Sequence, residues 1–114
     1  MPVTDGFREF VLEQLEQCTF EVRAKRMFGG VGVYSGEYFF ALIAGDRLYL
    51  KVDDQTRPAF EANGMEPFRP FGDRLASISY YEVPIGVLEA PDDLRTWVRD
   101  AVAVAQRAAA RPRR

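Results

Sequence analysis

Two very short connections between strand-like segments constrain the fold of this 114-residue chain more than any other feature. The runs Val31–Tyr34, Tyr38–Ala44 and Leu48–Val52 are rich in β-branched and aromatic residues, as strands are. Only Ser35-Gly36-Glu37 separates the first two runs, and only Gly45-Asp46-Arg47 separates the second two. Such connections join antiparallel neighbours, because a parallel crossover needs a dozen or more residues. The sequence therefore predicts an antiparallel meander, with the unbroken apolar run Tyr38–Ala44 at its centre and covered on both faces.

Amphipathic helices are expected on either side of this meander. Residues 4–18 carry apolar side chains at helical spacing, and Thr4 or Asp5 can cap the first turn. A second, long helix is expected from residue 90 onward, because Pro91 suits a first helical turn. Its apolar stripe consists of Leu94, Trp97, Val98, Ala101, Val102, Ala105 and Ala108. Each helix thus has one apolar face to pack against a sheet.

The remaining segments complete a two-layer protein. Residues 20–26 alternate apolar and charged side chains, which predicts a half-buried strand. Residues 54–63 predict a short helix that ends at Asn63-Gly64. Two further strands are expected over Glu66–Phe71, an edge strand because of its prolines, and over Ser77–Val83. The predicted fold class is α+β: helix, antiparallel meander, short helix, two further strands and a long C-terminal helix packed on the sheet.

A single domain accounts for the whole length, since single cores typically occupy roughly 100–150 residues. Residues 1–110 carry a formal charge of −5, with 12 Lys and Arg against 17 Asp and Glu, whereas residues 111–114 add three arginines. We expect residues 1–110 to form the domain and residues 111–114 to be a disordered basic tail. The acidic body makes direct nucleic-acid binding unfavourable. No apolar run approaches the roughly 20 residues of a membrane span and no signal peptide is evident, so we expect a cytoplasmic protein.

Histidine is absent and cysteine occurs once, at Cys18, which narrows the chemistry available to the chain. Histidine-dependent nucleophiles, histidine metal ligands and four-cysteine zinc sites are excluded. Cys18 ends an apolar helical stripe, where an inert buried thiol is the usual case. Gly29, Gly30, Gly32 and Gly36 lack the spacing of a dinucleotide-binding loop, and a strand rather than a helix follows, so a bulge or close backbone approach explains them better. We expect no catalytic residue, no metal and no cofactor.

Acidic residues gather near turns and a helix start: Asp46, Asp53, Asp54 and Glu61. Carboxylates at such positions cap backbone N–H groups. We favour this interpretation over a divalent cation site, because the chain has no calcium-loop motif. Acid–base chemistry by Glu82 or Asp53 together with Tyr80 is an alternative, although no spacing singles out such a pair.

Basic residues on separate segments are candidates for a binding patch if their strands adjoin: Arg23, Lys25, Arg26, Lys51 and Arg57. The alternative is a solvated face with scattered ion pairs. Tyr80 and Tyr81, near Phe68 and Phe71, could form a stacking platform for bases. Alternatively, one tyrosine packs in the core and the other lies on the surface. We take the five basic residues and the two tyrosines as the candidate partner-binding or nucleic-acid-binding surface.

Several segments, in this order, resemble the N-terminal domain of the TfoX/Sxy family of bacterial competence regulators. They are Arg26-Met27-Phe28-Gly29-Gly30-Val31-Gly32-Val33-Tyr34, Phe40-Ala41-Leu42-Ile43, Asp46-Arg47-Leu48-Tyr49-Leu50-Lys51-Val52-Asp53, the single residues Arg57, Phe60 and Gly64, then Pro67-Phe68 and Ser79-Tyr80-Tyr81-Glu82-Val83-Pro84. The resemblance runs from about Arg23 to Arg107. It implies a compact α+β fold with a helix–sheet layering similar to that of type III secretion chaperones.

The resemblance also implies a function. Two-domain members of the family act in competence with a cyclic-AMP-responsive transcription factor and have no recognised catalytic site. This chain is therefore expected to be a non-enzymatic regulatory or protein-interaction module, whose candidate partner is a transcription factor of the cyclic-AMP-receptor type. In two-domain members a helical second domain follows this one. This sequence ends at Arg114, before such a domain, so we expect a stand-alone N-terminal domain. A nucleic-acid-binding accessory domain, a small-molecule-binding protein and an enzyme are the alternatives, and the Ala-rich face of the last helix permits a homodimer.

Overall fold

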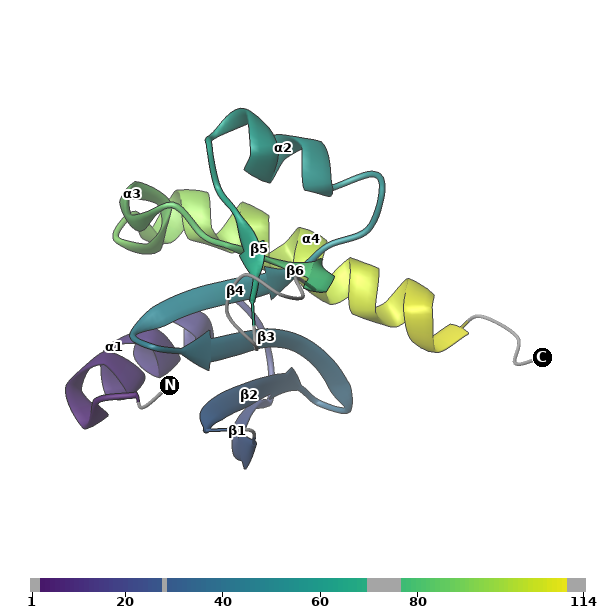
Figure 1. Ribbon diagram of the computed structural model, residues 1–114. Coiled ribbons are helices and arrows are strands. Elements are labelled where there is room, and N and C mark those ends of the chain that lie inside the picture. The colour runs from purple at the N-terminus through teal and green to yellow at the C-terminus, as the bar shows by residue number, and fades with distance from the viewer. Residues whose placement is uncertain (1–2, 28, 70–76, 111–114) are drawn as a thin grey trace.

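A computed structural model describes residues 3–27, 29–69 and 77–110. Six strands form one antiparallel sheet in the order β1-β2-β3-β4-β6-β5 (Figure 1). The elements in chain order are α1 (Asp5–Glu16), β1 (Val22–Met27), β2 (Gly30–Ser35), β3 (Tyr38–Ala44), β4 (Arg47–Lys51), α2 (Arg57–Ala62), β5 (Pro67–Phe68), β6 (Ser77–Glu82), α3 (Ile85–Leu88) and α4 (Pro91–Ala110). This arrangement confirms the predicted α+β fold class.

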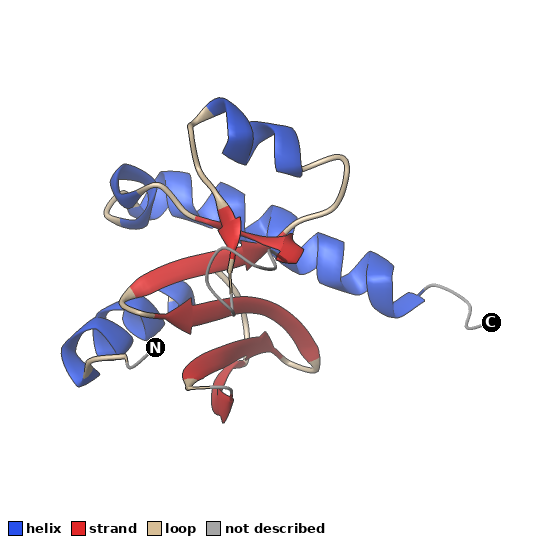
Figure 2. Ribbon diagram, viewed as in Figure 1, coloured by secondary structure: helices blue, strands red, loops and turns tan. Residues whose placement is uncertain are grey.

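One face of the sheet carries helices and holds the core. The long helix α4 runs along the sheet (Figure 2) and contacts β3 and β4, while α1 contacts β1. Val33 of β2, Ala41 of β3 and Leu50 of β4 are paired in register and are fully buried beneath this layer. Removing apolar surface from water, worth about 25 cal/mol per Å², is what holds the two layers together. We call this side of the sheet the core face.

The apolar stripes predicted for the two long helices are confirmed, with one change at the end of α4. Val11 and Leu15 of α1 are fully buried, and Thr4 caps this helix by accepting the Phe7 N–H at 3.3 Å. In α4, Val104 is buried, whereas Ala108 is exposed although the stripe included it. The last turns of α4 extend beyond the sheet (Figure 1), so the apolar spacing there has no layer to face.

The meander predicted for residues 31–52 is confirmed. Two-residue turns join its strands, with positive φ at Gly36 in the first turn and at both Gly45 and Asp46 in the second. Such turns match the natural twist of a hairpin. The strand β3 is central, as expected, but the helices of the described ranges cover it on one face only. Phe39 and Leu42 point to the opposite face and are half-buried there among side chains of the sheet.

Close backbone approach explains the glycines at the start of β2, as the sequence predicted. A Cβ on Gly30 would lie 2.5 Å from the Ile43 carbonyl oxygen, and a Cβ on Gly32 would lie 2.5 Å from Met27 Cε. The first contact involves the neighbouring strand's backbone, which cannot move without disturbing the β2–β3 pairing. The second is with a flexible side chain that lies over β2.

Several predicted boundaries shift. The first strand begins at Val22 rather than Phe20, because Glu21 has a positive φ of 47° and Phe20 is 54% exposed. The short helix begins at Arg57, which leaves Pro58 in its first turn, where a missing N–H is tolerated. The one-turn helix α3 was not predicted. The edge position of β5 is confirmed, although the end of the predicted strand, at residues 70–71, and the predicted basic tail, residues 111–114, lie outside the described residues.

Candidate interaction surface

A row of aromatic rings crosses the face of the sheet opposite α1 and α4, which we call the outer face. Tyr34 of β2 stacks on Phe39 of β3 with ring centroids 5.0 Å apart, and Phe39 lies 5.7 Å from the ring of Tyr80 of β6. A cation sits over each end of the row. The Arg23 guanidinium lies 5.5 Å from the Tyr34 ring, and Lys51 Nζ lies 5.0 Å from the Tyr80 ring. We call these five residues the aromatic row.

Strand register explains why these residues meet. Arg23 pairs with Tyr34, Tyr34 pairs with Phe39 across the hairpin turn, and Lys51 pairs with Tyr80. Paired residues of an antiparallel sheet project on the same side, so the whole row shares one face. Lys25 lies on this face as well, two residues along β1 from Arg23. The row thus draws on five strands, of which β6 lies far from the others in the sequence.

Burial shapes the electrostatics of the row. Half-burial lowers the pKa of Lys51, because the charged ammonium loses hydration. Burial raises the pKa of Tyr80 to about 12, with a smaller contribution from Tyr34. No carboxylate within the described ranges forms an ion pair with Lys51 or Arg23. The row therefore presents flat apolar rings with a cation at each end. Each cation contacts a ring face, and Arg23 also donates to the Gly36 carbonyl oxygen at 2.9 Å.

A second aromatic pair extends the outer face toward the other end of the sheet. Tyr49 of β4 meets Phe68 of β5 edge to face, with ring centroids 5.0 Å apart. Beside them Arg47 forms a 2.9 Å ion pair with Glu82. Burial raises the pKa of Tyr49, and the Glu82 carboxylate adds to that rise. This end of the face is charge-balanced, unlike the aromatic row.

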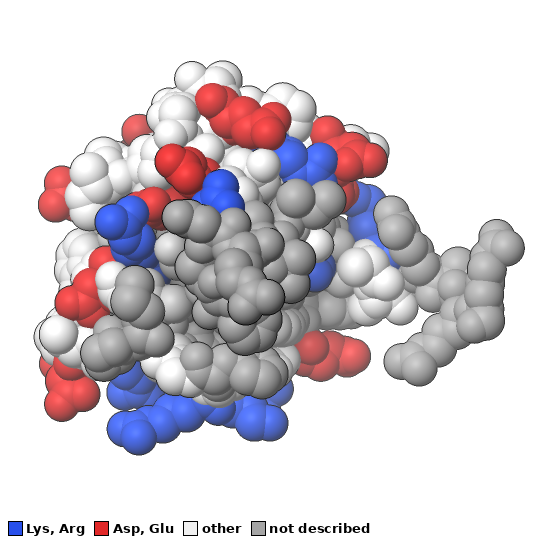
Figure 3. Space-filling view, in the orientation of Figure 1, with Lys and Arg blue, Asp and Glu red and all other residues white. Residues whose placement is uncertain are grey.

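The strand β1 forms one edge of the sheet and carries exposed cations: Arg23, Lys25 and Arg26. Figure 3 shows Lys and Arg side chains gathered at the lower margin of the molecule, where β1 runs. Strand alternation sends Arg23 and Lys25 to the outer face and Arg26 to the opposite side. The predicted basic patch is therefore divided. Arg23 and Lys25 accompany the aromatic row, and Arg26 faces a groove at the end of the hairpin.

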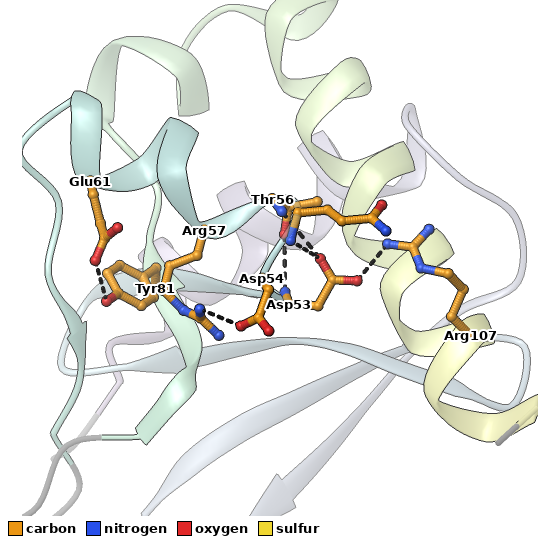
Figure 4. A network of polar contacts seen from close by, with 8 residues as sticks. Asp53, Asp54, Thr56, Arg57, Glu61, Tyr81 and Arg107 are labelled. Carbon is orange, nitrogen blue, oxygen red and sulfur yellow. Dashed lines mark hydrogen bonds and ion pairs between the residues drawn. The ribbon is translucent and has the colours of Figure 1, made fainter. Parts of the chain in front are cut away.

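Arg57 and Tyr81 belong to a different environment, around α2. Arg57 forms a 2.8 Å ion pair with Asp54 (Figure 4). Tyr81 is only 5% exposed, packs against Phe60, and donates its hydroxyl to Glu61 Oε2 at 3.1 Å. Burial, followed by that hydrogen bond, raises the pKa of Tyr81. The prediction that one tyrosine packs in the core while the other lies on the surface is confirmed, with Tyr80 on the outer face.

Of the carboxylates predicted to cap backbone N–H groups near α2, Asp53 does so, whereas Asp54 pairs with Arg57 and Glu61 accepts from Tyr81. Asp53 accepts the N–H groups of Gln55 and Thr56 through Oδ1, at 3.0 and 3.1 Å. Its Oδ2 accepts a 2.7 Å bond from Arg107 Nη2 at the end of α4 (Figure 4). The hydrogen bond from Arg107 is the main reason that the pKa of Asp53 lies below its usual value. Among the residues that the structure describes, no three carboxylate or thiolate side chains gather where they could hold a metal ion.

The Cys18 thiol is half-buried, donates to the Gln14 carbonyl oxygen at 3.2 Å, and has a pKa raised by burial, which fits an inert thiol. None of the described helices has the length and apolar character required to cross a membrane.

The sequence alone did not single out Tyr34, Phe39 and Tyr49 as surface residues. The signal was present at Tyr34 and Phe39, because a two-residue turn at Gly36-Glu37 places them opposite each other. The participation of Tyr80 and Lys51 depends on β6 pairing with β4, which no local pattern shows.

Comparison with known proteins identifies the family. The sequence model of the TfoX N-terminal domain matches residues 13–105, most of the chain, so this protein belongs to that domain family and the resemblance noted from its motifs is confirmed. Among curated proteins it is similar to the DNA transformation protein TfoX1 of Aliivibrio fischeri. The two are 29% identical over 79 residues, which cover 68% of this chain and 38% of that protein. The chain thus matches well under half the length of this relative.

Proposed function

We propose that this chain is a non-enzymatic regulatory module of the TfoX N-terminal type, which acts by binding a protein partner through the aromatic row. The family membership and the similarity to a DNA transformation protein support a role connected with competence. The observation that carries the proposal is the aromatic row itself, with three rings in contact and, at each end, a cation that forms no ion pair with a described carboxylate.

Protein interfaces favour this composition. Tyrosine, phenylalanine and arginine are enriched in interface cores, and a few such residues carry most of the binding energy. The rings are rigid because they already pack on one another, so binding immobilises few side chains. The cations at Arg23 and Lys51 favour a partner surface with carboxylates around an apolar centre. We take a transcription factor of the cyclic-AMP-receptor type as the candidate partner.

Size-exclusion chromatography with light scattering tests the proposal, using the full chain mixed with such a factor bound to DNA. We expect co-elution for the unaltered chain. The substitutions Tyr80→Ala and Arg23→Glu should each weaken the complex about tenfold or more, as removal of an interface anchor does. Ile85→Ala and Arg99→Glu are the matched controls, because they change an exposed apolar and an exposed basic side chain on α3 and α4. Separate elution of the unaltered chain, or binding by both row variants as tight as that of the controls, would contradict the proposal.

Binding of single-stranded nucleic acid is the second candidate function. Alternating rings and cations on a sheet face are also how several domains stack bases and hold phosphates. The acidic body of the chain opposes it. Fluorescence anisotropy with a labelled single-stranded oligonucleotide at low salt decides between the two: affinity that falls steeply with salt and is lost in Tyr80→Ala supports nucleic acid as the ligand, and no binding eliminates it.

A further inference from the structure

We propose that a groove at the end of the β1–β2 hairpin binds the carboxylate of an organic ligand. The groove has a volume of about 490 Å³ and lies where the start of α1 meets the hairpin. Its lining consists of Val3, Asp5, Arg8, Arg26, Met27, Gly29, Gly30 and Val31. It is distinct from the aromatic row, because Arg23 and Tyr34 occupy the opposite end of the same hairpin and Arg26 projects from the other side of β1.

Two guanidinium groups in this groove have no partner in the described part of the chain. Neither Arg8 nor Arg26 forms a side-chain hydrogen bond or an ion pair with another described residue. The Arg8 Nε atom is moreover buried, and no described residue supplies an acceptor for its N–H group. Buried donors are almost always satisfied in folded proteins. Arg8 lines the groove, so a ligand oxygen there becomes the missing acceptor when the guanidinium turns toward it.

Glycine backbone forms part of the groove wall, at Gly29 and Gly30. Gly29 has a φ of 77°, which β-carbon-bearing residues rarely adopt. Gly30 approaches the backbone of β3 so closely that a Cβ would collide with the Ile43 carbonyl oxygen. Arg26, Met27 and the two glycines also belong to the segment on which the family resemblance depends. Gly29 and Gly30 therefore line the groove with backbone and place no side chain in it.

The lining favours a carboxylate with a small apolar body over inorganic phosphate. A planar guanidinium matches the two oxygens of a carboxylate or a phosphate. Asp5 faces the same groove and disfavours a doubly charged anion more than a singly charged one. Val3 and Val31 supply apolar contact for the carbon part of a ligand, whereas the end of the Met27 side chain lies on the outer face beside Gly32 and Phe39. The carboxylate can belong to a free small molecule or to a polypeptide side chain, and the test below separates these sources.

Two-dimensional amide NMR of the full chain tests the inference, since arginine Nε–H groups also give signals in such spectra. The probe is 4-methylpentanoate, and 4-methylpentanamide is its uncharged control. We expect the carboxylate, but not the amide, to shift the Nε–H signals of Arg8 and Arg26 while the signals of Tyr34 and Tyr80 stay unchanged. Arg8→Gln and Arg26→Gln should each weaken binding about tenfold or more, the loss expected when a charged hydrogen-bond partner is removed. Arg99→Gln on α4 is the matched control.

The remaining outcomes are also decisive. Equal shifts with inorganic phosphate would overturn the assignment to a carboxylate, and the absence of any shift with 4-methylpentanoate would overturn the site. A short peptide that contains one glutamate, if it binds more tightly than 4-methylpentanoate at the same two arginines, identifies a polypeptide as the source. Weaker binding of the peptide at the same arginines identifies a free small carboxylate. Failure of the aromatic row to bind a partner would leave these results unaffected.

Discussion

Gly30 and Gly32 show how two missing side chains shape the sheet. At Gly30 the backbone of β3 occupies the position that a Cβ would take, and at Gly32 the ends of Met27 and Phe39 do so. A Cβ at Gly32 would lie 3.0 Å from Phe39 Cε1, so this glycine also leaves room for the central ring of the aromatic row. The two glycines therefore serve different purposes, although they look alike in the sequence.

Replacing Gly30 tests the tighter of these contacts. Gly30→Ala should lower the free energy of unfolding by about 1–3 kcal/mol, because the methyl group would lie 2.5 Å from the Ile43 carbonyl oxygen and the paired strands would have to separate. Urea unfolding followed by circular dichroism measures the change. Gly6→Ala in α1 is the control: a Cβ there meets nothing within 4 Å, so alanine should be neutral or stabilising by up to about 1 kcal/mol. A Gly30→Ala variant as stable as the unaltered chain would contradict the assigned role.

At the scale of elements, Asp53 ties the short helix α2 to the long helix α4. One carboxylate oxygen caps the turn that precedes α2, and the other accepts from Arg107 near the end of α4. Residues 54 positions apart in the sequence are thereby joined by one side chain. Phe60 of α2 adds an apolar contact to the same assembly, meeting the ring of Trp97 on α4 edge to face with centroids 4.6 Å apart.

Removing the cap and the ion pair of Asp53 together should lower the free energy of unfolding more than removing the ion pair alone. Asp53→Ala removes cap and ion pair and should cost about 1–2 kcal/mol, whereas Arg107→Ala removes only a partly exposed ion pair and should cost less than about 1 kcal/mol. Because the folded-state pKa of Asp53 lies below its unfolded value, its stabilisation is present above the unfolded pKa and is lost as pH falls through the folded one. Thermal unfolding from neutral to acidic pH should therefore show the gap between Asp53→Ala and the unaltered chain narrowing. Equal losses for both variants at neutral pH would mean that the cap contributes nothing.

For the whole molecule, the sheet has two edges of different character. The edge strand β5 is two residues long and contains Pro67, which cannot donate to a neighbouring strand. The other edge, β1, is six residues long and carries three exposed cations, a common protection against edge-to-edge association. The Ala-rich face of α4 is used within the chain, since Ala101 and Ala105 are buried in its own core. A homodimer stays a prediction, and it would have to use another surface.

Neutralising β1 tests this protective role. The double substitution Arg23→Gln with Lys25→Gln should raise the average mass measured by light scattering at high protein concentration, because an uncharged edge strand pairs more readily with a second copy. Arg95→Gln with Arg99→Gln removes the same charge from α4 and should leave the mass unchanged. An increase in both double variants would point to net charge rather than to the strand edge as the cause.

The candidate surface could be predicted only in part. The seven residues chosen for charge and aromaticity separate in the structure: Arg23, Lys25, Lys51 and Tyr80 reach the outer face, Arg26 faces the groove, and Arg57 and Tyr81 lie around α2. Residue type indicated which side chains could bind something. The pairing of distant strands decided which of them lie together.

The sequence by itself determined the described elements other than α3, and the order of β2, β3 and β4 in the sheet. Two-residue turns at Gly36-Glu37 and Gly45-Asp46 allow only antiparallel neighbours, and the apolar spacing of α1 and α4 specifies which helix faces are buried. Tertiary structure alone decided the pairing of β4 with β6, which brings Tyr80 beside Lys51, and the meeting of α1 with the β1–β2 hairpin, which places Arg8 near Arg26. The physical reason is the sequence separation over which each of these effects acts. Turn geometry and helical spacing depend on residues that are close together in the sequence. Contacts between distant segments depend instead on how the packed layers fit together as a whole.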